Sequence, residues 1–190
     1  MALSKMHPEA VAGIADRLAA CWLCILVLLL LAGCAAYDGR GLQPGVATVD
    51  DVIAVMGEPV LRWQDADGSL QLAYPRGPAG PHTYMAFFAP DGRLIRIENV
   101  LQMSHFSRIV PGRDDHEAIL RLLGPPNPAW TIYFAARDEL AWEWRFCDDW
   151  SRLARFDVLF DATSGLVRST MQRPEPSGYR GGAPYCGRSS

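Results

Sequence analysis

The densest group of side chains that could bind a metal ion or catalyse a reaction is Asp114-Asp115-His116-Glu117. Carboxylate and imidazole groups are metal ligands, and they also act as general acids and bases. Acidic residues are equally favoured at the start of a helix, where they accept hydrogen bonds from the first-turn amides. An apolar helical pattern follows directly, so we predict a helix cap formed by Asp114 and Glu117. A metal-dependent enzyme with a pocket around His116 is the less favoured alternative.

Motifs typical of the common enzyme classes are missing from the sequence. There is no G-x-S-x-G nucleophile elbow, no glycine loop that would cradle phosphate, and no H-E-x-x-H zinc motif. The formal net charge is −3, and no run of five or more basic residues exists, so a nucleic acid is not an expected partner. We therefore expect no catalytic residue, no metal site and no cofactor.

The residues Leu31-Ala32-Gly33-Cys34 end an apolar run that begins at Leu18. A large aliphatic residue, two small residues and a cysteine in this order resemble the lipobox of bacterial lipoproteins. The resemblance implies a signal peptide over residues 1–33, cleavage before Cys34, and acyl chains such as palmitate on the Cys34 thiol. Three acyl chains would anchor the mature protein to a membrane far more firmly than one.

The same apolar run could instead be an uncleaved membrane anchor, because Leu18 to Ala36 is long enough to cross a hydrocarbon core of about 30 Å. A signal peptide is favoured, because a basic start, an apolar stretch and small residues follow one another in the expected order. Ala35 stands where some inner-membrane lipoproteins have aspartate. We therefore expect a cell-envelope location, lipid-anchored in the outer membrane and facing the periplasm.

The remaining cysteines have different contexts. Cys21 and Cys24 form a C-x-x-C pattern, but they lie inside the apolar run, where no folded pocket would surround a redox or zinc site. Cys147 and Cys186 form an even pair in an exported domain, which suggests a disulfide, with two unpaired thiols as the alternative. Such a bridge would close a loop of about 40 residues and stabilise the fold by about 4 kcal/mol.

An internal repeat organises the chain after the apolar run. Gly45 precedes Gly57 by twelve positions, and Gly112 precedes Gly124 by the same number. Each interval reads as a short helix with one apolar face, closed by a glycine and a following proline. In the first interval, Thr48 and Asp51 have capping-box spacing. The apolar residues Val52, Ile53 and Met56 align with Ile119, Leu120 and Leu123.

Strand patterns follow each helix. Pro90-Asp91-Gly92 is a strong hairpin signal, and apolar residues alternate with polar ones along residues 140–146. Short helices and small sheets of this size need each other to bury a core. The strand-like segments are residues 60–64, 70–74, 83–89 and 93–100 in the first copy, and 129–134, 140–146, 153–160 and 166–171 in the second.

These patterns predict an α+β fold made of two tandem units, each a helix plus a three-stranded antiparallel sheet. We expect the two sheets to join edge to edge or to share one apolar layer. The predicted organisation is a signal peptide (1–33), a tether (34–44), a first repeat (45–100), a linker that is partly helical (101–110), a second repeat (111–171) and a disordered tail (172–190).

The run from Phe106 to Gly112, the segment Gly124-Pro125-Pro126 and the later Trp142-Glu143-Trp144-Arg145-Phe146 resemble the BamE (SmpA/OmlA) family of small outer-membrane lipoproteins. The resemblance implies a helix-plus-three-strand unit and a supporting role in the machinery that assembles outer-membrane β-barrel proteins. BamE itself has one such unit, whereas this chain has two. Duplicated units of this kind are also similar to the β-lactamase inhibitor protein.

The sequence thus predicts a non-enzymatic envelope lipoprotein that binds other proteins, with a role in outer-membrane protein assembly or envelope integrity. Its expected partners are the membrane, through the acyl anchor, and envelope proteins such as the β-barrel assembly machinery. The alternative is a periplasmic enzyme inhibitor or stress-related binding module on the same duplicated scaffold. Trp150, which follows Asp148-Asp149, is the candidate partner contact, because Trp is enriched at interface hot spots.

Overall fold

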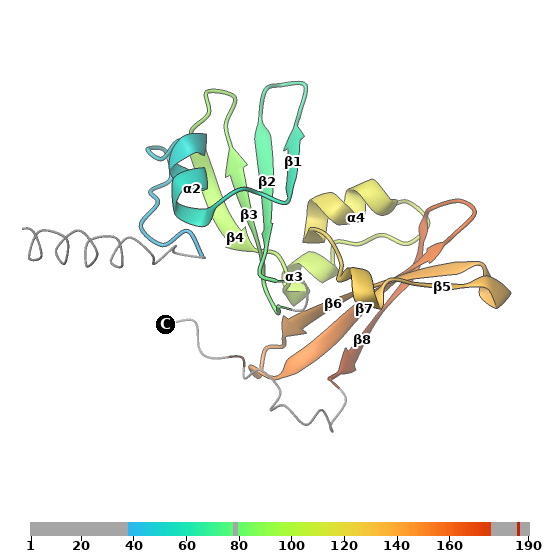
Figure 1. Ribbon diagram of the computed structural model, residues 1–190. Coiled ribbons are helices and arrows are strands. Elements are labelled where there is room, and N and C mark those ends of the chain that lie inside the picture. The colour runs from blue at the N-terminus through green and yellow to red at the C-terminus, as the bar shows by residue number, and fades with distance from the viewer. Residues whose placement is uncertain (1–37, 78–79, 176–185, 187–190) are drawn as a thin grey trace, which may run out of the picture. The chain divides into compact units, whose positions relative to one another are not determined.

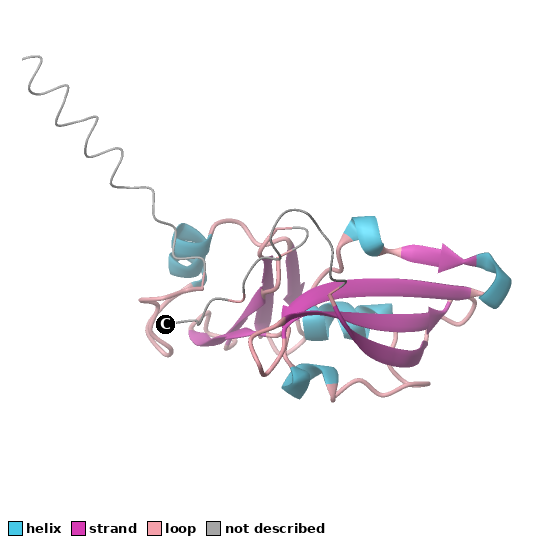
Figure 2. Cartoon of the chain, turned by 90° about the horizontal axis from the view of Figure 1, so that it is seen from below, coloured by secondary structure: helices cyan, strands magenta, loops and turns pink. Residues whose placement is uncertain are grey.

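The chain folds into an α+β structure with two antiparallel four-stranded sheets, shown by a computed structural model (Figures 1 and 2). The structure describes residues 38–77, 80–175 and 186, which belong to one compact unit. The expected signal peptide and the Cys34 attachment site lie outside the described residues. In the part of the chain that is described, no helix is both long and apolar enough to cross a bilayer.

Strands follow one another as neighbours in both sheets, in the order β1-β2-β3-β4 and β5-β6-β7-β8. Short turns make every pairing antiparallel, as consecutive hairpins require. The strands are β1 Leu61–Gln64, β2 Leu70–Pro75, β3 Thr83–Phe88, β4 Leu94–Asn99, β5 Ile132–Phe134, β6 Glu139–Cys147, β7 Leu153–Asp161 and β8 Val167–Pro174.

The expectation of three strands per unit is wrong, because the short edge segments β1 and β5 also pair with their neighbours. In β1, Leu61 pairs with Ala73, and in β5, Ile132 pairs with Ala141. The expectation that the two sheets join edge to edge is also wrong, because no backbone strand pairing connects them among the described residues. The predicted repeat itself is present, since a helix precedes each four-stranded sheet.

The helices are short. They are α2 Val49–Met56, α3 Met103–Phe106 and α4 His116–Leu123, with 3₁₀ turns η1 Pro128–Trp130 and η2 Ala135–Arg137. Thr48 and Asp51 form the predicted capping box of α2. In α4, however, the cap is Asp115, whose carboxylate accepts from the amide of Ala118, whereas Asp114 accepts from the amide of Val110. The prediction of a cap formed by Asp114 and Glu117 was therefore wrong by one residue.

Helix α4 contacts both repeat units, each of which is a helix with its four-stranded sheet. Its residues Ile119 and Leu123 are buried in the core of the second sheet, together with Phe106 of α3. Its C-terminal end meets the first sheet, because the side-chain amide of Gln71 in β2 donates to the carbonyl of Arg121 over 2.6 Å. Helix α2 packs on the other face of that sheet, where Val52 shares a core cluster with Leu72. Figure 1 shows α2 and α4 on opposite sides of the first sheet.

The ends of the folded region are longer than the sequence patterns indicate. Before the first repeat, Leu42 of the predicted tether packs against the first core. At the other end, β8 continues through Pro174, and Glu175 forms ion pairs, so the predicted disordered tail does not begin at residue 172. These strand residues are polar, and their ordering comes from pairing with β7 and from charge, which apolar periodicity does not report.

Candidate protein-binding surfaces

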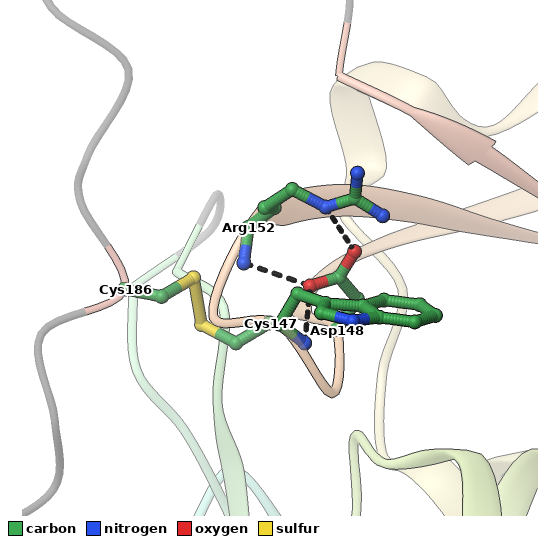
Figure 3. The surroundings of a disulfide bond; sticks show 5 residues. Cys147, Asp148, Arg152 and Cys186 are labelled. Carbon is green, nitrogen blue, oxygen red and sulfur yellow. Dashed lines mark hydrogen bonds and ion pairs between the residues drawn. A yellow bond between two sulfur atoms is a disulfide. The ribbon is translucent and has the colours of Figure 1, made fainter.

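Trp150 lies on the turn between β6 and β7, which we call the Trp150 turn (residues 148–152), and is 75% exposed. The carboxylate of Asp148 organises this turn, because it accepts from the amides of Trp150 (3.0 Å) and Arg152 (2.8 Å) and from the Arg152 guanidinium (2.9 Å; Figure 3). Burial raises the pKa of Asp148, but these bonds outweigh burial and leave the pKa below its ordinary value.

A disulfide joins Cys147 and Cys186 at the base of the Trp150 turn, with Cα atoms 5.9 Å apart (Figure 3). The guanidinium of Arg152 lies 5.0 Å from the centre of the Trp150 ring, which is within cation–π range. The turn therefore presents a large aromatic side chain to solvent. Its backbone is held by the hydrogen bonds to Asp148 and by the disulfide at Cys147.

A second exposed apolar group lies on β5, the outer strand of the second sheet. Its three residues, which we call the aromatic edge, are Ile132, Tyr133 and Phe134, and they are 49%, 55% and 38% exposed. Exposed strand edges usually carry charges or are covered, because their backbone groups and apolar side chains invite pairing with other chains. An uncovered apolar edge is therefore a candidate binding surface.

Local contacts hold the aromatic edge in place. The hydroxyl of Tyr133 donates to Asp138 over 3.0 Å, and this bond raises the pKa of Tyr133. The guanidinium of Arg137 stacks on the Phe134 ring at 4.6 Å from its centre. Since Phe134 pairs with Glu139 at the start of β6, and the Trp150 turn follows the end of β6, the two exposed groups lie at opposite ends of that strand.

Behind the aromatic edge, the open face of the second sheet has a groove of about 330 Å³. Trp130 lines it, with the guanidinium groups of Arg145 and Arg155 at 4.8 and 4.6 Å from the centre of its ring. Ile132 and Phe134 also line this groove. The groove therefore extends the aromatic edge inward with an amphipathic surface, of the kind that is enriched in protein interfaces.

Two buried carboxylates lie opposite each other at the bottom of this groove, Glu143 on β6 and Asp157 on β7. Each is only 5% exposed. A close pair of buried acids is a common arrangement for acid–base catalysis. Here burial raises the pKa of Glu143 above its ordinary value, although Arg155 and Arg173 oppose that rise.

Arginines neutralise the pair, so we assign it a structural role. Arg155 donates to Glu143 over 2.6 Å, and Arg173 donates to Glu143 and Asp157. Arg155 also donates to Glu175, and this bond is the largest influence raising the pKa of Arg155. These ion pairs link β6, β7 and the end of β8. The alternating pattern of residues 140–146 placed Glu143 and Arg145 on the polar face of their strand, but the sequence did not show which acid faces which arginine, and it assigned Arg173 and Glu175 to the tail.

The acidic cluster at the start of α4 does not converge on a site. The ring of His116 packs against Phe160 at 4.3 Å and Trp142 at 4.9 Å between ring centres, whereas Asp114 and Asp115 bond to backbone amides. In residues 38–77, 80–175 and 186, no three His, Cys, Asp or Glu side chains are grouped so that they could hold a metal ion.

Comparison with known proteins gives no relative: no family model, curated protein or solved structure matches the chain.

Proposed function

We propose that this chain is a non-enzymatic, lipid-anchored envelope protein that binds other proteins through the aromatic edge. The observation that supports the proposal most is the exposure of all three β5 residues, with Tyr133 at 55%, on an outer strand that no other described strand pairs with on its free side. Aromatic and aliphatic anchors beside an amphipathic groove are typical of protein-binding surfaces. The lipobox-like segment ending at Cys34 and the resemblance to BamE supply the proposed location and a partner class, the β-barrel assembly machinery or other envelope proteins.

Site-specific photo-crosslinking from Tyr133 tests the binding surface. A photoreactive phenylalanine analogue at position 133 should yield a crosslinked envelope protein in intact cells, and the same analogue at Ser169, an exposed position on β8 of the same sheet, should yield much less. Mass spectrometry then identifies the partner. If the two positions give the same products, or if position 133 gives none, the aromatic edge is not a binding surface.

The proposed anchor needs a separate test. Wild-type protein should fractionate with the outer membrane, and its mature N-terminus should be Cys34 carrying acyl mass. Cys34→Ala should lose the acyl mass and leave the outer-membrane fraction. A natural product that keeps its first methionine and carries no acyl chain contradicts the lipoprotein assignment without bearing on the aromatic edge.

The Trp150 turn supports a second candidate function, an enzyme inhibitor or stress-related binding module. A single exposed aromatic residue on a turn held by Asp148 and a disulfide is suited to insertion into the cleft of a soluble enzyme. Inhibition of periplasmic hydrolases by the full chain, lost in Trp150→Ala and kept in Tyr133→Ala, would favour this function. Crosslinks from position 133, together with no inhibition or with inhibition that Trp150→Ala leaves unchanged, would favour the aromatic edge.

A further inference from the structure

A cleft of about 340 Å³ lies where the first sheet meets the segment from α3 to α4, and we call it the interunit cleft. It is distinct from the aromatic edge, which lies on the open face of the second sheet. Its floor includes apolar side chains such as Phe87 of β3 and Leu122 of α4. Its walls are strongly charged, with guanidinium groups on Arg96, Arg108, Arg113 and Arg121.

The guanidinium groups outnumber the carboxylates of the lining, which are Glu98 and Asp114. Glu98 accepts from Arg96 over 3.1 Å, and Asp114 accepts from Arg113 over 2.8 Å. Burial raises the pKa of Asp114, but the bonds from Arg113 and the Val110 amide outweigh it, so the carboxyl stays ionised at neutral pH. The cleft is therefore not acidic, although the chain as a whole has a net charge of −3.

Donors remain available to a ligand. Arg121 is engaged by Asp65 and Glu117 outside the cleft. Arg108, in contrast, has no ion pair and no side-chain hydrogen bond with any residue that the structure describes, so its charge is uncompensated locally. The Nε atoms of Arg96 and Arg113 are the ones that bond to Glu98 and Asp114, which leaves their terminal nitrogens to donate elsewhere.

The position of Arg96 is also fixed. Its guanidinium stacks on the Phe87 ring at 3.8 Å from the ring centre while Glu98 holds its Nε. A planar guanidinium held in this way is pre-organised to donate two parallel hydrogen bonds to a carboxylate. Arg108 supplies the opposite charge that such a ligand needs, and the apolar side chains of Phe87 and Leu122 accommodate the methylene groups of an acidic side chain.

We propose that the interunit cleft binds a carboxylate of an acidic segment in a partner protein, with Arg108 as its principal charge partner and Arg96 and Arg113 as additional donors. A carboxylate is favoured over phosphate because the lining arginines other than Arg121 exceed the lining carboxylates by a single charge, whereas a phosphate monoester carries nearly two.

Binding of fluorescent hexaglutamate to the full chain in non-ionic detergent tests the proposal, with hexaglutamine as the neutral probe. We expect binding of hexaglutamate that weakens with added salt, and little binding of hexaglutamine. Arg108→Gln should weaken hexaglutamate binding about five- to tenfold, as loss of a charge-assisted hydrogen bond would. The matched control, Arg62→Gln, removes the same charge from the exposed face of β1 and should change binding less than about twofold.

A second variant tests the cleft by strengthening it. Glu98→Gln removes a negative charge from the lining but keeps a side-chain oxygen that can accept from Nε of Arg96. It should therefore tighten hexaglutamate binding several-fold, a gain that a merely destabilised protein would not show. Equal effects of Arg108→Gln and Arg62→Gln, or no binding by wild type, overturn the proposal. Displacement of hexaglutamate by low-millimolar inorganic phosphate also overturns it, in favour of a phosphate site. None of these results depends on crosslinking from Tyr133.

Discussion

The side-chain amide of Gln71 donates to the main-chain carbonyl of Arg121 over 2.6 Å, and this bond joins the first sheet to helix α4. In a regular helix, the carbonyl of Arg121 would accept from the amide four residues later. That residue is Pro125, which has no amide hydrogen. Gln71, which is 9% exposed, therefore supplies the missing donor from the other unit.

Gln71→Leu should lower the free energy of unfolding by about 1–2 kcal/mol, because a partly buried carbonyl then loses its donor. Urea denaturation followed by circular dichroism measures the change. The control is Gln64→Leu, which replaces the same residue type at an exposed position of β1. A loss no larger than in this control would mean that water replaces the Gln71 amide at no cost.

Gly124 and Gly57 end α4 and α2 at equivalent positions of the repeat, with φ of 77° and 84°. Alanine at either site should lower the free energy of unfolding by about 1–3 kcal/mol, since this backbone conformation strongly favours glycine. At Gly124 a Cβ atom would also lie 2.7 Å from Cγ2 of Thr83, whereas at Gly57 it would meet nothing within 4 Å.

Gly124→Ala should therefore be the more destabilising of the two by about 1 kcal/mol or more, because it also overpacks the contact with Thr83 on the first sheet. Thermal unfolding of the two variants side by side makes the comparison. Equal losses would show that the two units move apart easily at this point, and would argue against tight contact between α4 and β3.

The disulfide between Cys147 and Cys186 has a sequence separation of 39 residues. Replacing both cysteines with serine should lower the free energy of unfolding by about 4 kcal/mol in the chain-entropy model. Urea midpoints with and without a reductant measure this effect. The urea midpoint of the double variant should not change when the reductant is added. The midpoint of wild type should fall toward that of the double variant. A wild-type midpoint that ignores the reductant, once thiol release is verified, would contradict the expected stabilisation.

Glu175 makes stability depend on pH at the end of β8. The hydrogen bond from Arg155 lowers the pKa of Glu175 below its ordinary value of 4.5; burial opposes this shift and Arg145 adds to it. Because the folded pKa is the lower one, the stabilisation is present above pH 4.5 and is lost as the pH falls through the folded pKa. The bonds concerned are those of Glu175 to Arg155 and Arg145.

Glu175→Gln should therefore be less stable than wild type at pH 6, and the difference should shrink as the pH falls toward 3. Urea denaturation of both proteins across this range gives the comparison. Asp91→Asn, at the exposed β3–β4 turn, serves as the control for general effects of acid. If the difference in free energy of unfolding between wild type and Glu175→Gln does not vary with pH, the ionisation of Glu175 does not contribute to the stability of the fold.

Local sequence signals determined much of the fold. The capping box of Thr48 and Asp51, the glycine ends of α2 and α4, and the hairpin at Asp91-Gly92 each depend on residues within four positions of one another. Such signals act through backbone hydrogen bonds and allowed backbone angles, so they can be read before the chain folds. The repeat followed from the same local patterns, because it is their recurrence.

Which distant residues meet depends on how separate segments of the chain pack together. The sequence gives no sign that Gln71 completes the end of α4 or that Arg155 lies between Glu143 and Glu175. It marks residues 60–64 and 129–134 as strand-like, but it does not show that β1 and β5 pair as a fourth strand of each sheet. Strand register and the placement of α4 between two sheets depend on packing between segments far apart in the chain. Among the residues that the structure describes, the exposure of Tyr133 and the lack of an ion pair at Arg108 are also set by how distant segments pack.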